Sequence, residues 1–371
     1  MSAENGLGPL VRRWGLSVQH LPSATAGQDE LKLFVAPILK EALPFIDSAA
    51  PKIPSPDTKK LWKSKGAKTS PDSTAKVDVL ERVISVKDLE HIAANGKFKG
   101  KIEEETWATR LSVHEDAAKK GTASWDEFDH SFRLEHGKTE MAFTPDVIGA
   151  NEAQRWDCAG IELEEAGLSW DRFSLVVEEM RHKIGRPILK DRTFPVLQLS
   201  CAVKEGTGAQ EFVIVSIPVP DFATSDHAKL SKEKGAQIAF YVSIERIRKL
   251  EDGKIEWLLG TASDAGGILP LWIQDLALPG IVWKDVPMYL SWIAKERQKT
   301  GTGASSEPAP AAAPAADVGA NTETEQGPQV TTGATTEPTE AVSGTATTGE
   351  PVSDEVTPAV HTGADAGKAT S

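Results

Sequence analysis

Three polar residues, Arg110, Ser112 and His114, occupy alternate positions in the stretch Thr106–Glu115. Alternate residues of a β-strand point to the same side of a sheet, so a strand here places all three on one face. The face is either a polar cluster that points into a pocket or a solvated surface paired with acidic residues, and periodicity does not choose between them. With Glu179, Arg110 and His114 are our candidates for acid–base chemistry.

Motifs for common cofactors and catalytic centres are missing from the sequence. It contains no GxGxxG, GxxxxGK[ST] or HExxH, and Ser263 lacks the flanking glycines of a GxSxG elbow. Gly266 and Gly267 therefore indicate a turn. Cys158 and Cys201 belong to no CxxC pair, which is typical of reduced thiols in the cytoplasm. We predict no metal and no cofactor, and a non-enzymatic function ahead of an enzymatic one.

The acidic charge of the chain is concentrated at its C-terminal end. Residues 301–371 hold ten acids and one base, −9 of the total −13, which leaves −4 for residues 1–300. They contain no Leu, Ile, Phe, Trp, Tyr, Met or Cys, so they cannot bury enough apolar surface to offset chain entropy. We expect 300–371 to be a disordered acidic tail. We expect no nucleic-acid binding, because that requires a basic face.

A lysine-rich segment, 51–76, has the Pro, Lys and Ser composition of a long loop. Its lysines, which include Lys59, Lys60 and Lys63, surround Trp62. Lysines near an anionic membrane contribute about 1 kcal/mol each, and an aromatic residue can anchor at the interface. We therefore expect a transient contact of these four residues with an anionic membrane surface, with a plain solvated loop as the alternative.

The remaining pattern predicts helices at both ends and strands between them. Asp29–Asp47 is an amphipathic helix, and Ser124–Gly137 begins with a capping box, Ser124 and Glu127. A second helical region starts at Leu269, breaks at Pro279-Gly280, and restarts with Asp285 as N-cap. Five strands are expected at 170–182, 194–203, 212–218, 238–247 and 255–262. Short turns between strands indicate an antiparallel sheet, and the fold class is α+β.

Several segments together resemble a known family. They are SWDEFDHSFRLEHGKTE, VVEEMRHKI, LKDRTFPVLQLSC, FVIVSIPVP, YVSIERIRKL and IEWLLGTASDAGGILPLWIQDLALPGIVWKDVPMYLSWI. They resemble START-like domains of the SRPBCC superfamily, and most closely the mainly fungal family of domain of unknown function 3074. The resemblance implies a helix-grip fold, in which a curved antiparallel sheet wraps around a kinked C-terminal helix. We expect a flexible N-terminus over 1–22, the START-like domain over 23–299 and the tail after it.

The resemblance also implies an apolar tunnel for one lipid-like molecule between sheet and helix. In some sterol-carrying members an acidic and a basic residue on neighbouring strands face this tunnel. Glu179 matches the acidic position, but Gln198 stands at the basic one, so the pair is not reproduced. By strand and helix periodicity the expected lining residues are Phe173, Leu175, Val177, Glu179, Phe194, Val196, Gln198, Leu269, Trp272, Ile273, Leu276 and Tyr289, with Arg110 and His114 as polar groups.

These observations leave three functions open. We favour non-enzymatic binding, and transfer, of a lipid or other hydrophobic small molecule by a cytoplasmic monomer that touches membranes peripherally. The second is a cyclase-like or hydrolase-like enzyme that uses the same cavity, and the third is an adaptor whose cavity is vestigial. A packed core without a cavity produces the same apolar pattern, so only the tertiary structure can choose.

Overall fold

The computed structural model describes residues 9–53, 56–93, 101–183, 190–264 and 277–301. The chain divides into two units, Met1–Glu307 and Pro308–Ser371, and every described residue belongs to the first. The expected disordered tail therefore lies, from residue 302 onward, outside the described residues.

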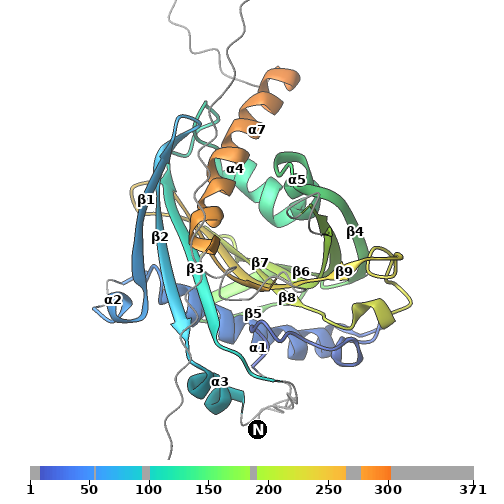
Figure 1. The fold of residues 1–371 in the computed structure, drawn as a ribbon. Coiled ribbons are helices and arrows are strands. Elements are labelled where there is room, and N and C mark those ends of the chain that lie inside the picture. The colour runs from blue at the N-terminus through green and yellow to red at the C-terminus, as the bar shows by residue number, and fades with distance from the viewer. Residues whose placement is uncertain (1–8, 54–55, 94–100, 184–189, 265–276, 302–371) are drawn as a thin grey trace, which may run out of the picture. The chain divides into compact units, whose positions relative to one another are not determined.

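Strands dominate this unit and form one curved sheet (Figure 1). In the described part of the chain the sheet has eleven strands: β1 Lys63–Ser70, β2 Ser73–Ile84, β3 Glu105–His114, β4 Val147–Trp156, β5 Leu163–Glu165, β6 Leu168–His182, β7 Arg192–Val203, β8 Glu211–Pro218, β9 Gln237–Ile238, β10 Phe240–Lys249 and β11 Ile255–Asp264. Their order is β1-β2-β3-β11-β10-β8-β7-β6-β4, with β5 beside β6 and β9 beside β7. Every pairing is antiparallel except β7 with β9.

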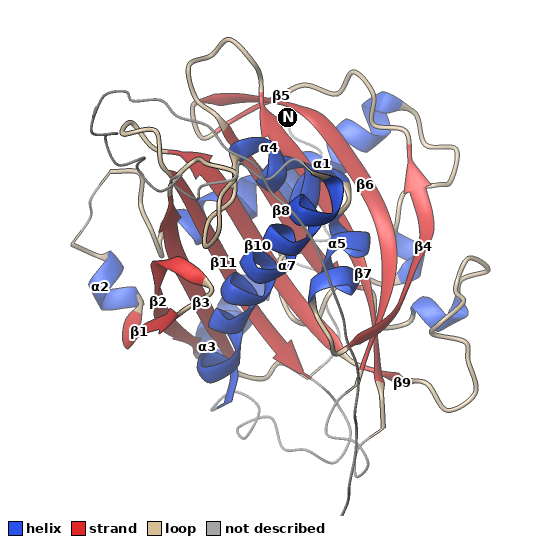
Figure 2. Ribbon diagram, turned by 90° about the horizontal axis from the view of Figure 1, so that it is seen from above, coloured by secondary structure: helices blue, strands red, loops and turns tan. Residues whose placement is uncertain are grey.

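Helices cover both faces of the sheet. The helical elements are η1 Val18–His20, α1 Gln28–Asp47, α2 Thr58–Leu61, α3 Val86–Ala93, α4 Trp125–Phe128, η2 Asp129–Leu134, α5 His136–Phe143, η3 Phe222–Thr224, η4 Val282–Lys284 and α7 Asp285–Thr300. The concave face holds α4, α5 and α7, and α1 lies on the opposite side (Figure 1). Seen from above, α7 runs obliquely across the strands (Figure 2). We call the side of α7 the inner face and the side of α1 the outer face.

The outer face carries the larger apolar core. Nine side chains of α1 are buried, because apolar residues recur at the spacing of one helix face. They pack in one cluster with outward-facing residues of the central strands: Leu197, Leu199, Val213, Val215, Val242, Ile244 and Leu258. The inner-face cluster is smaller and largely aromatic. This asymmetry makes the outer face the main source of hydrophobic stabilisation.

The lysine-rich segment is not the long loop that we expected. Residues 63–84 form a β-hairpin, β1 and β2, whose turn is Pro71-Asp72 because Ser70 pairs with Ser73. β1 is exposed along almost its whole length and lies at the edge of the sheet. Lysines are common on edge strands, because their charge discourages pairing with other chains. The composition that resembled a loop is therefore that of a solvated edge.

The expectation of a flexible N-terminus is wrong for residues 9–22. Leu10, Val11 and Leu16 are buried in the outer core. The Leu16 N–H donates to Pro218 O at 2.9 Å, at the end of β8. Gly15 permits this approach, because its φ is +68° and a Cβ would lie 2.0 Å from Pro218 O. The segment is thus an integral part of the fold.

The C-terminal helical region differs in detail from the prediction. Residues 277–281 are helical, so Pro279-Gly280 does not break the helix; the change of geometry comes at η4. Asp285 is the first residue of α7 and does not cap it, since its carboxylate pairs with Arg110 instead. Gly266 and Gly267 lie outside the described residues. The predicted α+β class, with a curved antiparallel sheet around a C-terminal helix, is confirmed.

Candidate functional site

A row of polar side chains crosses the middle of the inner face. Gln198 pairs with Ser216, Ser216 with Ser243, and Ser243 with Thr261, so one residue from each of β7, β8, β10 and β11 lies side by side. We call these four residues the polar row; Ala108 of β3 continues it, opposite Thr261. Directly paired residues of antiparallel strands point to the same face. The middle of this face therefore carries polar side chains, three of them short, where a sheet core normally carries large apolar ones.

Apolar residues flank the polar row on the inner face. Val176 of β6 pairs with Gln198, and Val196 and Phe194 follow on β7. All three are buried. A strip of polar groups beside an apolar wall matches the composition of sites for small molecules, which are mainly apolar with a few fixed polar groups.

At one end of the polar row, Arg110 forms a buried charged group with acids from two other elements. Its Nη2 lies 3.1 Å from Glu245 Oε1, and its Nε lies 3.4 Å from Asp285 Oδ2. The guanidinium carbon stands 4.1 Å from the centroid of a Trp257 ring, whose indole N–H donates to Glu245 at 2.5 Å. Arg110 Nη1 is buried without a partner. Burial raises the pKa of Glu245 more than Arg110 and Trp257 lower it.

The inward side of α5 adds further titratable groups. Gln198 Nε2 lies 3.1 Å from His136 Nδ1, and Glu140 Oε2 is 3.8 Å from the same nitrogen. Burial, aided by the charges of Asp285, Glu178 and Glu245, raises the pKa of Glu140 to about 8. Glu140 is therefore mostly protonated at pH 7 and can donate a hydrogen bond.

Glycine allows α5 to lie close to the sheet at this point. A Cβ at Gly137 would meet the Glu178 carboxylate oxygens at 2.9 and 3.0 Å. Burial raises the pKa of Glu178 and lowers that of His136. Together with the Arg110 group, this part of the inner face holds four carboxyl groups, Glu140, Glu178, Glu245 and Asp285, and one guanidinium. Such a set can accept and donate several hydrogen bonds to a polar ligand group.

Beside the Arg110 group, the inner face is closed by aromatic packing. Tyr289 of α7 is fully buried, and its ring lies 4.7 Å from Phe132, 5.5 Å from Phe128 and 5.6 Å from Trp257, centroid to centroid. Its hydroxyl donates to Glu127 O at 3.1 Å. Tyr289 thus belongs to a packed cluster with Phe128 and Phe132, which follow Ser124 in the chain. The predicted capping box of Ser124 and Glu127 is confirmed.

The residues predicted on β6 lie on the wrong face for the expected cavity. Phe173, Leu175 and Val177 pack in the outer core with α1, whereas Phe194, Val196 and Gln198 of β7 point inward. The register explains the difference: Val176 and Glu178, not Val177 and Glu179, pair with Gln198 and Val196. A one-residue change of phase moves a whole strand's side chains to the opposite face.

Glu179 also points outward, and its carboxylate is fully used there. It accepts backbone N–H bonds from Lys229, Leu230 and Ser231 at 2.9, 3.0 and 2.7 Å, and one from Asn151 Nδ2 at 2.9 Å. Burial alone would raise its pKa, but these hydrogen bonds outweigh that effect and lower it. Glu179 anchors the loop after β8, so the expectation that it faces the tunnel is wrong.

Arg110, Ser112 and His114 are buried on the inner face, which decides between the two readings of this strand. His114 Nε2 lies 2.8 Å from Ser112 Oγ, and burial, aided by the Arg110 charge, lowers the His114 pKa to about 4. Because Glu179 points to the other side of the sheet, the three acid–base candidates do not converge.

Two further sets of predicted residues have separate outcomes. Leu269, Trp272, Ile273 and Leu276 lie outside the described residues. Lys59, Lys60 and Lys63 are exposed, but Trp62 is 3% exposed, with its ring edge-on to Phe45 and its indole N–H donating to Ser48 at 2.9 Å. The expected aromatic membrane anchor is therefore part of the core.

Sequence reasoning missed the polar row and Glu140. The signal existed, because Ser216, Ser243 and Thr261 each interrupt an apolar strand with a hydroxyl residue, and His136 and Glu140 have helical i, i+4 spacing. The sequence did not reveal the register that aligns these residues on three separate strands.

Comparison with known proteins places the chain in a family. Residues 107–293 match the family described as "Protein of unknown function (DUF3074)". The chain belongs to this family. The match spans β3 to α7 and thus contains the polar row, Arg110 and Glu140, so the candidate site lies wholly within the DUF3074 region. No curated protein matches the chain.

Solved structures of human proteins are similar to this DUF3074 chain at low identity. The crystal structure of human STARD10 has a TM-score of 0.43 and 11% identity, covering 70% of this chain and 82% of that one. The human StarD13 (DLC2) lipid transfer and protein localization domain has a TM-score of 0.38 and 14% identity, covering 62% and 89%. Human StAR-related lipid transfer protein 5 has a TM-score of 0.38 and 13% identity, covering 64% and 88%.

The described residues of this DUF3074 chain lack two kinds of feature. Within those residues, no cluster of three or more His, Cys, Asp or Glu side chains has the arrangement needed to hold a metal ion. Over the same ranges, no helix is both long and apolar enough to cross a membrane.

Proposed function

We propose that the protein binds a lipid-like amphiphile against the inner face of the sheet, under α5 and α7, without catalysing a reaction on it. The observation that carries this proposal is the polar row: Gln198, Ser216, Ser243 and Thr261 in register across four central strands of a buried face. A face that served only as a packed core would carry large apolar residues here, as the outer face does.

The two sides of the row suit the two parts of an amphiphile. The apolar part of the ligand lies along Val176, Val196 and Phe194, while its polar part meets the row and the Arg110 group. Burial of about 500 Å² of ligand surface contributes roughly 12 kcal/mol before the costs of association. One or two hydrogen bonds to buried polar groups then supply specificity. An enzymatic role is less favoured, because the acid–base candidates named from sequence do not converge.

Transfer between membranes would require contact with a bilayer. Lys59, Lys60 and Lys63 are exposed, and Ile53 and Leu61 nearby in sequence are 82% and 43% exposed. We infer that these residues contact an anionic membrane surface. The two aliphatic side chains then act as the apolar anchor that the sequence predicted Trp62 to be. The two free, buried cysteines suit the cytoplasmic location predicted from the sequence.

The ligand proposal is tested by blocking the row. Ser243→Leu places a larger side chain in the middle of the inner face, and Ser64→Leu on the exposed β1 is the control. Native mass spectrometry of the protein after exposure to sterol, phospholipid and sphingolipid panels reports any bound lipid. We expect one class to bind the native protein and the control, and binding to Ser243→Leu to fall by at least about tenfold. If no lipid binds the native protein, or if both variants bind equally, the proposal is wrong.

A further inference from the structure

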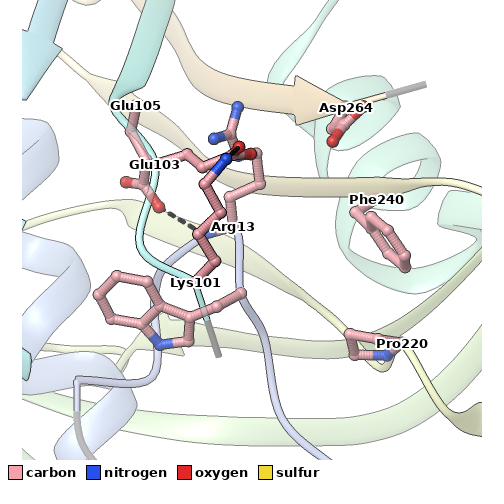
Figure 3. Close-up of a pocket in the computed structure, with 8 residues that line it drawn as sticks. Arg13, Lys101, Glu103, Glu105, Pro220, Phe240 and Asp264 are labelled. Carbon is pink, nitrogen blue, oxygen red and sulfur yellow. Dashed lines mark hydrogen bonds and ion pairs between the residues drawn. The ribbon is translucent and has the colours of Figure 1, made fainter. Parts of the chain in front are cut away.

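A pocket lies on the outer side of the sheet. It has a volume of about 200 Å³, and its lining comes from the N-terminal segment, the residues leading into β3, and the paired ends of β10 and β11. Figure 3 shows Arg13, Lys101, Glu103 and Glu105 on one side of it and Phe240 and Pro220 on the other. We propose that this pocket binds a small organic oxyanion, a carboxylate or a phosphate monoester, with an apolar body.

Strand parity separates this pocket from the inner-face site. Phe240 and Asp264 pair with one another, and each is adjacent in sequence to an inward-facing residue, Tyr241 and Ser263. Glu105 likewise precedes Thr106 and binds the indole of Trp107, which packs in the outer core. Because successive residues of a strand point to opposite faces, the pocket opens on the outer side. Its ligand would therefore be distinct from the amphiphile proposed above.

Arg13 contributes a buried positive charge to the wall of this pocket. The residue is 8% exposed, and its Nη2 donates to the carbonyl of Glu104 at 2.9 Å. Nη1 is buried and has no partner, and within the described ranges Arg13 forms no ion pair. A buried guanidinium is costly unless it is paired with a negative charge and its N–H groups are used. A bound oxyanion supplies both, in the geometry that guanidinium groups prefer.

Glu103 and Glu105, on the same side of the pocket as Arg13, are already bound by other groups of the protein. Glu105 accepts from the backbone N–H of Arg13 at 2.7 Å through Oε1 and from Trp107 at 3.0 Å through Oε2. Glu103 pairs with Lys101 at 2.7 Å, and this hydrogen bond is the main cause of its lowered pKa. Figure 3 shows Asp264 apart from Arg13, at the end of β11, so an anionic group fits best at the Arg13 end.

The other residues that line the pocket indicate the shape and polarity of the rest of the ligand. Trp14, Pro220 and Phe240 provide apolar surface opposite and beside the charged residues. The volume is below the roughly 300–1,000 Å³ of sites for drug-sized molecules. A compact acid such as an aryl carboxylate or aryl phosphate meets both conditions, with its ring on the aromatic side chains and its acid group toward Arg13.

The test uses four probes and the full chain. Sodium benzoate and phenyl phosphate carry an acid group on a ring, inorganic phosphate lacks the ring, and benzylamine reverses the charge. Calorimetric titration should show binding of benzoate or phenyl phosphate, weaker binding of inorganic phosphate, and none of benzylamine. The tighter of the first two distinguishes a carboxylate from a phosphate ester. Arg13→Gln should weaken that binding at least about tenfold.

Two control variants test whether a loss of binding is specific to Arg13. Lys101→Gln removes an exposed cation of the same pocket and should change the affinity far less than Arg13→Gln. Ser243→Leu on the inner face should leave benzoate binding unchanged. If Arg13→Gln does not fold, the indole NMR signal of Trp14, assigned by Trp14→Phe, must shift when benzoate is added to the native chain. Absence of acid binding, equal affinity of Arg13→Gln, or equal binding of benzylamine would overturn the proposal.

Discussion

Arg110 and Glu245 form an ion pair inside the molecule, with Nη2 and Oε1 3.1 Å apart and both side chains less than a tenth exposed. Asp285 brings the first turn of α7 to the same guanidinium at 3.4 Å. The pair therefore joins two central strands of the sheet to the C-terminal helix. Its strength determines how firmly the start of α7 is held against the inner face.

Breaking this pair from one side should be strongly destabilising. Arg110→Gln leaves the buried Glu245 and the half-buried Asp285 without their cation, which costs about 3–5 kcal/mol. Urea unfolding followed by circular dichroism measures this loss. The double variant Arg110→Met, Glu245→Leu removes both charges and should recover part of it. A single variant as stable as the native chain would contradict the assigned burial.

Glu140 should make the protein less stable as pH rises. The folded-state pKa of about 8 lies above the ordinary value of 4.5, so the folded state binds the proton more tightly than the unfolded state does. The stabilisation is full below about pH 4.5 and is lost as pH rises through about 8. Glu140→Gln should flatten this slope and gain about 1–3 kcal/mol at pH 8. Unfolding midpoints measured from pH 5 to 9 test this, and parallel slopes for both proteins would contradict it.

Glu179 should matter for stability and not for ligand binding. Glu179→Ala leaves the N–H groups of Lys229, Leu230 and Ser231 without their acceptor, at a cost of about 3 kcal/mol. Because its pKa is lowered, its contribution is present above the ordinary value of 4.5 and is lost as pH falls below it. Hydrogen exchange should show faster exchange in the loop around residue 230. Loss of lipid binding by a folded Glu179→Ala would instead restore the tunnel role predicted from sequence.

The end of α7 is clamped by Arg297. Its Nε and Nη2 each lie 2.6 Å from a Glu127 carboxylate oxygen, and Arg297 is 5% exposed. Nη1 and Nη2 also donate to the carbonyls of Lys119 and Thr122. Arg297→Ala should cost about 3 kcal/mol or more in thermal unfolding. Lys299→Ala, which breaks an exposed pair with Glu296, should cost less than about 0.5 kcal/mol. Equal losses of stability in the two variants would show that the Arg297 contacts contribute no more than an exposed ion pair.

Variants of the lysine-rich segment should distinguish the residues that bind a membrane from the residue that packs in the core. The triple variant Lys59→Glu, Lys60→Glu, Lys63→Glu should lose most binding to vesicles with anionic lipid, in proportion to about 1 kcal/mol per lysine. Vesicles of neutral lipid and the exposed Lys299→Glu variant are the controls. Trp62→Ala should lower the unfolding temperature because the ring is buried. Unchanged sedimentation of the triple variant with anionic vesicles would exclude this surface.

Local pattern determined the strands β6, β7, β8, β10 and β11, the amphipathic helix α1 and the capping box at Ser124. These depend on neighbours in sequence: alternation, helical spacing and the Ser124–Glu127 pair. The edge hairpin β1–β2 was not predicted, because a solvated edge needs little apolar surface and so has the composition of a loop. The packing of segment 9–22 was not predicted, because its partners, Glu41 and Pro218, are distant in sequence.

The site depended on information that no single segment contains. Arg110 and His114 were singled out by strand alternation, but only the pairing of β3 with β11, and of β11 with β10, brings Arg110 to Glu245. The polar row exists only because four strands align at one register, and a one-residue shift would turn Ser216 or Ser243 to the outer face. The same parity rule sent Glu179 outward and Glu178 inward. Sequence by itself determined which elements form; the long-range hydrogen-bond register decided which side chains meet.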